Sequence, residues 1–334
     1  MALKPDNDRH AAQIEAGTTG RKRGHSFESL VAEGVNRIPM PFSRHALSAG
    51  CLFKGDPSRA LLNFLLNELD ISRVVSVKAI SAGALATAEE GAKILVVNGV
   101  EVRRCKSDVI LTLEAGGKIV AKGVSVKQCS NKNPTNAQLY FSTATAFCQL
   151  LRNSGIQVSD QAVVAMRMFC GDATFRPLDN PAALRGRRCD PNRWFWEELP
   201  AVARKELEDV FTKQQDAITR LLLQKAYLED PFAPEFLVHQ TRGVTKGNEI
   251  EVAIFSIDGF IRLSRGYAGF HTRPYRIKKG SHKDPLDIKH LAPRFGVVQF
   301  QRGGQKQHPT QLQFNLKAGY FYKPPFSPAA EESV

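Results

Sequence analysis

A Gly-Gly turn joins two β-branched-rich runs within residues 106–128. Gly116 and Gly117 suit the two central positions of a type I′ turn, where φ is positive at both residues. A two-residue turn sets the register of its flanking strands, and this one places Asp108 directly opposite Ser125. The sequence therefore predicts an antiparallel hairpin whose open end carries polar residues.

The open end of this hairpin brings a carboxylate and an amine to one face. Side chains alternate along a strand, so Ser125 and Lys127 share a face while Val124 and Val126 point to the other. Directly opposed residues project to the same side, and Asp108 therefore joins Ser125 and Lys127. Such a pair can hold a divalent metal and steady a phosphate or an attacking water. The alternative interpretation is a pair of solvated charges without a catalytic role.

The chain is strongly basic. It has 334 residues, 24% of them charged, and a net charge of +13. Residues 240–334 hold 15 Lys and Arg against 7 Asp and Glu, so +8 of the excess lies in this last part. Phosphates dominate the affinity of proteins for nucleic acids, and a polyanionic partner fits this distribution. A basic chain need not bind a specific partner, however.

Cysteine spacing argues against a zinc site or a disulfide framework. The six cysteines have no Cys-x-x-Cys spacing and no neighbouring His at ligand spacing, and we expect them to be reduced and mostly buried. The N-terminus has no apolar signal core, and no run is long enough to span a bilayer. We therefore expect a cytoplasmic protein without a membrane partner.

The expected organisation is a flexible N-terminal arm over 1–20, a single domain over 21–323 and a tail over 324–334. Apolar residues at helical spacing predict a helix around Phe27, and Ser58 suits the cap of a buried amphipathic helix over 58–70. The other expected elements are strands at 74–80 and 92–97, a helix over 137–151 opened by Asn133-Pro134, a strand or helix at 159–170, a loop at 180–191, a helical region over 194–228, a strand at 250–255 and a hairpin of 296–301 with 311–316.

Metal-dependent phosphodiester hydrolysis needs hard oxygen ligands, a cation beside the scissile phosphate and an activated water. Asp108 would ligate Mg²⁺, and Lys127 would orient the water and offset charge in the transition state. Ser125 stands where the commoner Asp…Glu-x-Lys pattern has an acidic residue, so another group or a water must compensate. Glu28, beside the apolar stripe of the first helix, is the candidate for this role. The alternative is a solvated helix carboxylate.

Several segments together resemble the PD-(D/E)XK nucleases, and among these the MspI/HpaII-type type II restriction endonucleases. In chain order they are Gly24-His-Ser-Phe-Glu28, the run from Lys106-Ser-Asp108 to Val124-Ser-Val-Lys127, Phe255-Ser-Ile-Asp-Gly-Phe260 as a strand element, and Arg294-Phe-Gly296 with Leu312-Gln-Phe314. They occur in the order of the family and cover most of the chain. In this family a neutral polar residue already replaces the acidic residue before x-Lys, as Ser125 does. Ser107 stands where a proline often precedes the aspartate.

The resemblance implies an α/β fold with a restriction-endonuclease-like central mixed β-sheet flanked by helices, and an added C-terminal β-hairpin region. It implies a catalytic core over residues 21–170 and a DNA-recognition region over 171–323. The expected activity is Mg²⁺-dependent hydrolysis of double-stranded DNA at a short palindromic site, with a DNA methyltransferase as functional partner and a homodimer as an open option. Two alternatives remain: a non-catalytic basic nucleic-acid-binding protein, and a repair or nicking nuclease of the same fold.

Polar side chains of the C-terminal hairpin are candidates for reading bases, because Arg and Lys pair with guanine and Gln with adenine in the major groove. They are Gln299, Gln301, Arg302, Gln305, Lys306, Gln307, Gln311 and Gln313. A second set is expected to hold phosphates. It consists of Arg185, Arg187, Arg188, Arg273, Arg276, Lys278 and Lys279. Both sets can equally form a solvated surface.

Overall fold

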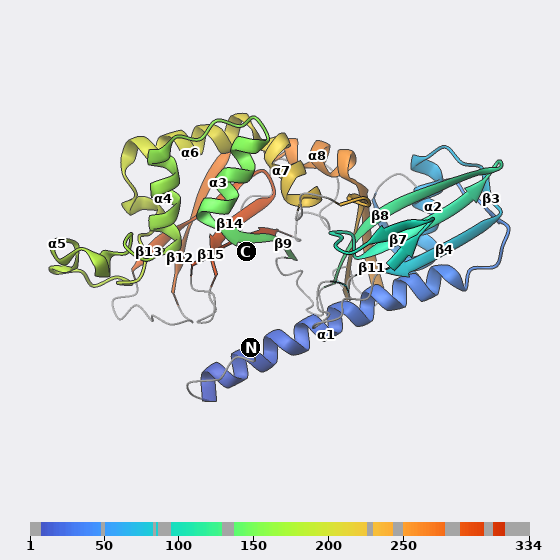
Figure 1. Ribbon diagram of the computed structural model, residues 1–334, viewed down its shortest axis with the longest axis horizontal. Coiled ribbons are helices and arrows are strands. Elements are labelled where there is room, and N and C mark those ends of the chain that lie inside the picture. The colour runs from blue at the N-terminus through green and yellow to red at the C-terminus, as the bar shows by residue number, and fades with distance from the viewer. Residues whose placement is uncertain are drawn as a thin grey trace. The chain divides into compact units, whose positions relative to one another are not determined.

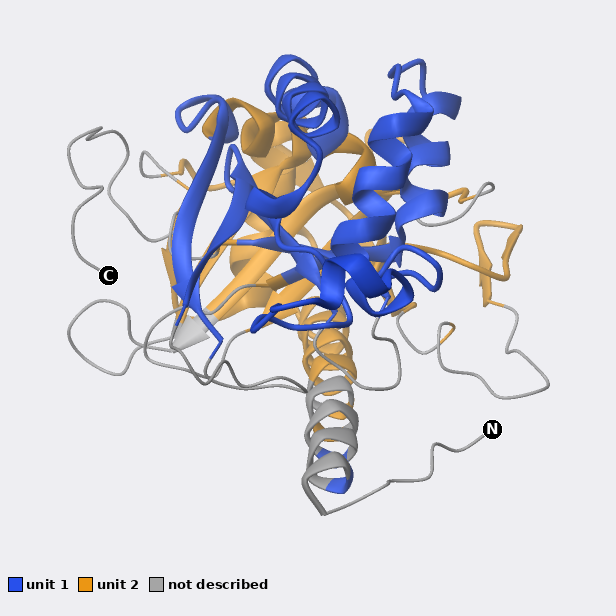
Figure 2. Cartoon of the chain, turned by 90° about the vertical axis from the view of Figure 1, so that its left-hand side faces the viewer, with its two compact units in different colours: residues 1–15, 138–219, 264–316 blue, residues 16–137, 220–263, 317–334 orange. Residues whose placement is uncertain are grey.

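The computed structural model describes residues 8–47, 51–82, 85, 95–128, 137–225, 230–242, 250–277, 288–303 and 310–317. The chain forms two compact units, each assembled from separate stretches (Figure 2). Unit 1 comprises residues 1–15, 138–219 and 264–316, and unit 2 comprises residues 16–137, 220–263 and 317–334. The boundary near residue 170 that the sequence suggested lies inside unit 1.

Unit 2 is built on a mixed six-stranded sheet with the strand order β2-β11-β10-β8-β7-β4. Figure 1 labels β4, β7, β8 and β11 of this sheet. Strands β8 and β10 run parallel, and the other neighbours in this sheet are antiparallel. The strands are β2 (Leu52–Lys54), β4 (Ser76–Ser81), β7 (Val109–Ala115), β8 (Lys118–Gln128), β10 (Pro234–Arg242) and β11 (Ile250–Ser256). There are also two small two-stranded antiparallel sheets. One pairs β1 (Phe42–Ser43) with β3 (Arg73–Val74), and the other pairs β5 (Leu95–Val97) with β6 (Val100–Val102).

Two helices cover one face of this sheet. Helix α2 (Pro57–Glu68) begins at the N-cap Asp56, whose side chain accepts a hydrogen bond from the Ser58 amide. Its apolar side packs with α1 (Asp8–Asn36) against alternate residues of the strands, including Val124 and Val126. The side chains of Ser125 and Lys127, which alternate with these valines in β8, therefore face away from this core, as the alternation of the sequence predicts.

Unit 1 is a sheet in the order β12-β13-β14-β15-β9, packed against helices, and its strands β12 to β15 run antiparallel to their neighbours in this series. Stacked and tilted aromatic contacts join Phe211 and Phe147 of the helices to Phe300 and Phe314 of the strands. The strands are β9 (Ala137–Thr143), β12 (Phe270–Arg276), β13 (Lys289–Phe295), β14 (Val298–Arg302) and β15 (Gln311–Leu316). The helices are α3 (Ala144–Asn153), α4 (Asp160–Cys170), α5 (Pro181–Leu184) and α6 (Ala201–Lys213), with 3₁₀ turns at Pro177–Asp179 and Trp196–Glu198. Two further helices, α7 (Gln215–Gln224) and α8 (Ile257–Arg265), each contribute residues to both units.

Four expectations from the sequence are corrected. Helix α1 begins at Asp8, so residues 8–20 are helical, whereas the sequence predicted a flexible arm over 1–20. No proline occurs in residues 8–36, so nothing in this stretch breaks the helix. Residues 137–143 form β9, and the helix expected there begins only after Thr143, which caps α3. The helical region over 194–228 is divided at Pro200 and Gln214. The expected strand at 255–260 ends at Ser256, whose hydroxyl accepts from the Gly259 amide in the first turn of α8.

The expected C-terminal hairpin is confirmed as β14 and β15, and residues 159–170 form helix α4. Five cysteines lie in the described residues, all as free thiols, and Cys129 lies outside them. Burial raises the pKa of Cys105 and Cys148 to about 12, so both thiols stay protonated. None of the described helices combines the length and apolar character needed to cross a bilayer.

Candidate functional site

The β7–β8 hairpin has the predicted turn and register. Gly116 and Gly117 have φ values of 55° and 72°, the positive values that a type I′ turn requires. The Cα pairing runs as far as Val109 opposite Val124. Beyond this pair, the Asp108 amide donates to the Val124 carbonyl at 2.9 Å. The predicted register is therefore confirmed up to the Val109–Val124 pair, and Asp108 follows directly beyond it, with its side chain hydrogen-bonded to Ser125.

Three donors converge on one oxygen of Asp108. Its Oδ2 accepts hydrogen bonds from Ser125 Oγ at 3.1 Å, from the Val126 amide at 2.7 Å and from Lys127 Nζ at 2.8 Å. The Lys127 and Asp108 side chains are 26% and 16% exposed, so solvent reaches both. None of the described residues donates a hydrogen bond to Oδ1. The carboxylate is thus held in one orientation through Oδ2, while Oδ1 has acceptor capacity left.

Glu28 of α1 lies within electrostatic range of this pair. Burial raises the pKa of Glu28 above its ordinary value, and the negative charge of Asp108 raises it further, while His25 and Lys127 act in the opposite direction. His25 Nδ1 is 3.2 Å from Glu28 Oε2. The structure therefore joins Asp108, Ser125 and Lys127 by hydrogen bonds, and α1 places Glu28 within electrostatic range of Asp108 and Lys127. His25 is an addition from the same helix.

The donor set fits a magnesium ion. The negative charge of Asp108 disfavours the ionised form of Glu28, and a divalent cation would offset this repulsion. Mg²⁺ prefers hard oxygen ligands and commonly binds through one or two carboxylates while it keeps several waters. No group of three or more His, Cys, Asp or Glu side chains arranged for a metal occurs in the part of the chain that the structure describes. Asp108 and Glu28 would therefore hold the ion together with water.

The segment that leads to Asp108 is hydrogen-bonded to a loop that lies far along the chain. The Lys106 amide donates to Asp230 Oδ2 at 2.8 Å, and Ser107 Oγ donates to the Phe232 carbonyl at 2.5 Å. Lys106 Nζ donates to the Leu222 carbonyl and, at 3.2 Å, to that of Lys225, at the C-terminal end of α7. Burial, with the nearby charge of Lys127, lowers the pKa of Lys106 to about 7. The sequence interpretation gave Lys106 no role, because its partners lie more than 100 residues further along the chain.

Gly123 permits the close approach of this loop to β8. A Cβ at position 123 would lie 2.2 Å from Ser107 Oγ and 2.7 Å from the carbonyl oxygens of Phe232 and Ala233. We expect Gly123→Ala to lower the free energy of unfolding by about 1–3 kcal/mol, because the backbone must move to make room. Urea denaturation measures this effect. The matched control is Gly24→Ala, whose Cβ would meet only Glu28, at 4.0 Å. Equal stability of the two variants would contradict the close approach.

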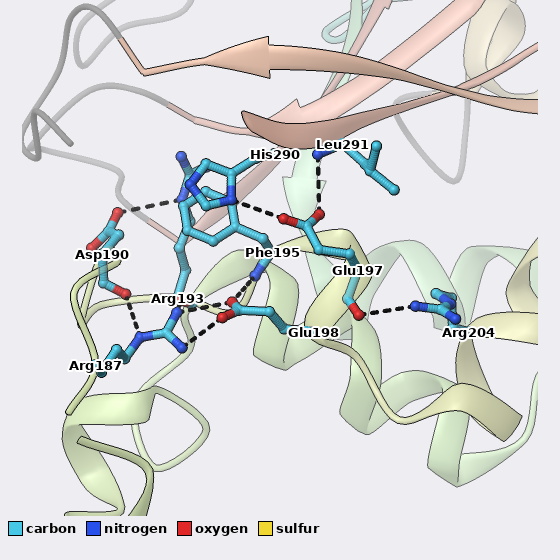
Figure 3. Close-up of polar contacts among 9 residues, drawn as sticks. All are labelled: Arg187, Asp190, Arg193, Phe195, Glu197, Glu198, Arg204, His290 and Leu291. Carbon is cyan, nitrogen blue, oxygen red and sulfur yellow. Dashed lines mark hydrogen bonds and ion pairs between the residues drawn. The ribbon is translucent and has the colours of Figure 1, made fainter. Parts of the chain in front are cut away.

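Two of the arginines expected to contact DNA have internal partners in unit 1. The Arg187 side chain is only 7% exposed and binds Glu198 with two hydrogen bonds, of 2.7 and 2.9 Å (Figure 3). The Arg302 side chain is 8% exposed, 3.7 Å from Asp190, and donates to the Asn192 carbonyl at 3.2 Å. Both guanidinium groups bind internal partners, which argues against phosphate binding by Arg187 and base contact by Arg302.

Of the remaining candidates for DNA contact, some are accessible to solvent and the others lie outside the residues that the structure describes. Gln301 pairs with Gln313 across β14 and β15, and the alternation of the strands places Gln299 and Gln311 on the same face. These four glutamines are exposed or half-buried, and Arg185, Arg188, Arg273 and Arg276 are exposed. Gln305, Lys306, Gln307, Lys278 and Lys279 lie outside the described residues. The glutamine face therefore stays a candidate surface for unit 1.

Comparison with known proteins adds no relative to this picture. No protein-family model matches the chain, and no curated protein matches it significantly.

Proposed function

We propose that Asp108, Lys127 and Glu28 form the catalytic centre of a Mg²⁺-dependent deoxyribonuclease with a restriction-endonuclease-like fold. The observation that carries the proposal is the 2.8 Å contact between Lys127 Nζ and Asp108 Oδ2 at the solvent-accessible end of a hairpin in a mixed sheet. The spacing of Asp108, Ser125 and Lys127 and the position of Glu28 support the same assignment, as does the net charge of +13.

Each residue has a role that its contacts support. Mg²⁺, when bound, supplies Lewis-acid stabilisation of the phosphate and a more acidic water. Asp108 is oriented by its three donors, so its second oxygen can be presented as a fixed ligand. Glu28 adds a second oxygen donor from α1. Lys127 has an ammonium group with three N–H donors, one of which is used by Asp108, and the others can orient water and offset phosphate charge.

We further propose that the activity is that of a type II restriction endonuclease, which cleaves both strands of duplex DNA at a short palindrome. The support is the resemblance of the ordered motifs, together with the glutamine face of β14 and β15, which offers side chains that pair with base edges. A cognate DNA methyltransferase is then the functional partner.

Incubation of the protein with supercoiled plasmid and Mg²⁺ tests the proposal. Discrete linear fragments are the expected result for a restriction endonuclease. Open circles without fragments would indicate a nicking or repair nuclease of the same fold. A gel shift without any cleavage, across Mg²⁺ and Mn²⁺, would leave a non-catalytic nucleic-acid-binding protein and would reject the catalytic assignment.

Replacement of Lys127 by Met should lower the cleavage rate about a hundredfold, because one preorganised donor to the developing charge is lost. DNA affinity, measured by gel shift in Ca²⁺, should change little by comparison. The matched control is Lys122→Met on the same strand, since Lys122 is engaged with Glu235 at 2.5 Å and faces no part of the site. A Lys127→Met enzyme as fast as the Lys122→Met enzyme would show that the amine has no catalytic role.

A further inference from the structure

A histidine flanks Lys127 on the side away from Asp108. Strand β8 lies between β7 and β10, and the parallel register of β8 and β10 pairs Lys127 with His239. Neighbouring strands are about 4.8 Å apart, and paired residues project to the same face. Lys127 therefore has the Asp108 carboxylate on its β7 side and an imidazole on its β10 side.

His239 is enclosed and uncharged. Its exposed fraction is 0%, so the ring does not meet a DNA substrate. Burial, with the nearby positive charge of Lys127, lowers the pKa of His239 to about 4, so the ring is neutral at pH 7. On its other side the paired residue of β11 is Ala253, which is small and buried. A neutral ring does not repel the ammonium group of Lys127.

We propose that His239 is a positioning residue that keeps the ammonium group of Lys127 directed at Asp108. It fills the flank of Lys127 with a neutral polar ring, so the amine cannot turn toward β10. The catalytic meaning of this placement rests on the proposed nuclease function. The pairing of His239 with Lys127 is a property of the sheet, and its effect on Lys127 can be measured without DNA.

Three substitutions test the proposal. His239→Ala should lower kcat for DNA cleavage about tenfold, the size of effect typical of residues that orient a ligand or catalytic group, and should leave the Kd for DNA within about twofold. His239→Gln, which is neutral and polar, should recover most of kcat. His239→Glu should lower kcat further, because a second carboxylate draws the ammonium away from Asp108. The matched control is Val238→Ala, a fully buried neighbour that belongs to the core on the opposite face.

A second readout follows Lys127 itself. Acetic anhydride modifies lysines according to their accessibility and protonation, and mass spectrometry gives the rate at Lys127 in the protein without DNA or metal. We expect this rate to rise severalfold in His239→Ala and to stay near the wild-type rate in His239→Gln and Val238→Ala. Circular dichroism establishes that each variant is folded.

The outcomes separate the two proposals. Equal losses of kcat in His239→Ala, His239→Gln and Val238→Ala would reduce His239 to a packing residue and overturn the inference. An unchanged acetylation rate at Lys127 in His239→Ala would overturn it as well. If the wild-type protein cleaves no DNA, the nuclease proposal fails, and the acetylation rates alone decide whether His239 positions Lys127.

Discussion

With Asn in place of Asp108, DNA cleavage should fall about a thousandfold while the fold and the DNA affinity persist. The substitution keeps the shape of the side chain but removes its charge, and with it the ion pair to Lys127 at 2.8 Å. An amide is also a poorer ligand than a carboxylate for a hard divalent cation. A metal contributes several kcal/mol to transition-state stabilisation, and each 1.4 kcal/mol, roughly, is a factor of ten in rate.

Single-turnover cleavage of plasmid DNA measures this effect, with thermal unfolding and a gel shift in Ca²⁺ as checks on fold and affinity. The matched control is Asp70→Asn in the same unit. The Asp70 side chain is 93% exposed and pairs with Arg44, and its φ of 51° is one that Asn also tolerates. Cleavage by Asp108→Asn at the rate of this control would remove Asp108 from the catalytic centre.

Replacement of Arg187 by Met should destabilise unit 1 by about 3 kcal/mol. The guanidinium binds both oxygens of Glu198 and donates to the carbonyls of Asp190, at 3.2 Å, and Arg193, at 3.0 Å (Figure 3). It also lies 5.0 Å from the centre of the Trp194 ring. Methionine retains the apolar stem but leaves the partly buried Glu198 carboxylate without its counter-ion, which is the costly part of breaking such a pair.

Urea unfolding followed by tryptophan fluorescence measures the loss, because the two tryptophans of the chain, Trp194 and Trp196, both lie in unit 1. The exposed Arg185, changed to Met, is the control and should alter stability by less than about 0.5 kcal/mol. If Arg187 instead held a phosphate, Arg187→Met would weaken DNA binding at unchanged stability. That result would restore the phosphate-binding role expected from the sequence.

The basic cluster at residues 185–188 shows why charge alone does not distinguish exposed arginines from buried ones. Arg185, Arg187 and Arg188 lie within four residues and read as one basic cluster. Only the fold places Glu198 beside Arg187, and burial of that pair depends on packing around Trp194. Residue type and spacing carry no information about which carboxylate a guanidinium will meet.

The error at residues 137–143 has a different physical origin. The Asn133-Pro134 start signal and the apolar run suggested one helix over 137–151, but residues 137–143 form a strand in the sheet of unit 1. Tyr140 contacts Phe314 there, with ring centres 6.3 Å apart. Aromatic and β-branched residues suit either structure until a neighbouring strand is present, so tertiary contact decided between them.

The sequence by itself determined the hairpin and its register as far as the Val109–Val124 pair, because a two-glycine turn sets its own dihedral angles and the register follows from adjacent residues. It also indicated that Lys127 shares the face of Asp108. The sequence also named Glu28 as a candidate, but only the tertiary structure decided that α1 places it within electrostatic range of the pair. His239 was not foreseen, because it comes from β10, more than 100 residues after Lys127. Such encounters depend on how helices and strands pack over a shared core, and local backbone preferences do not specify them.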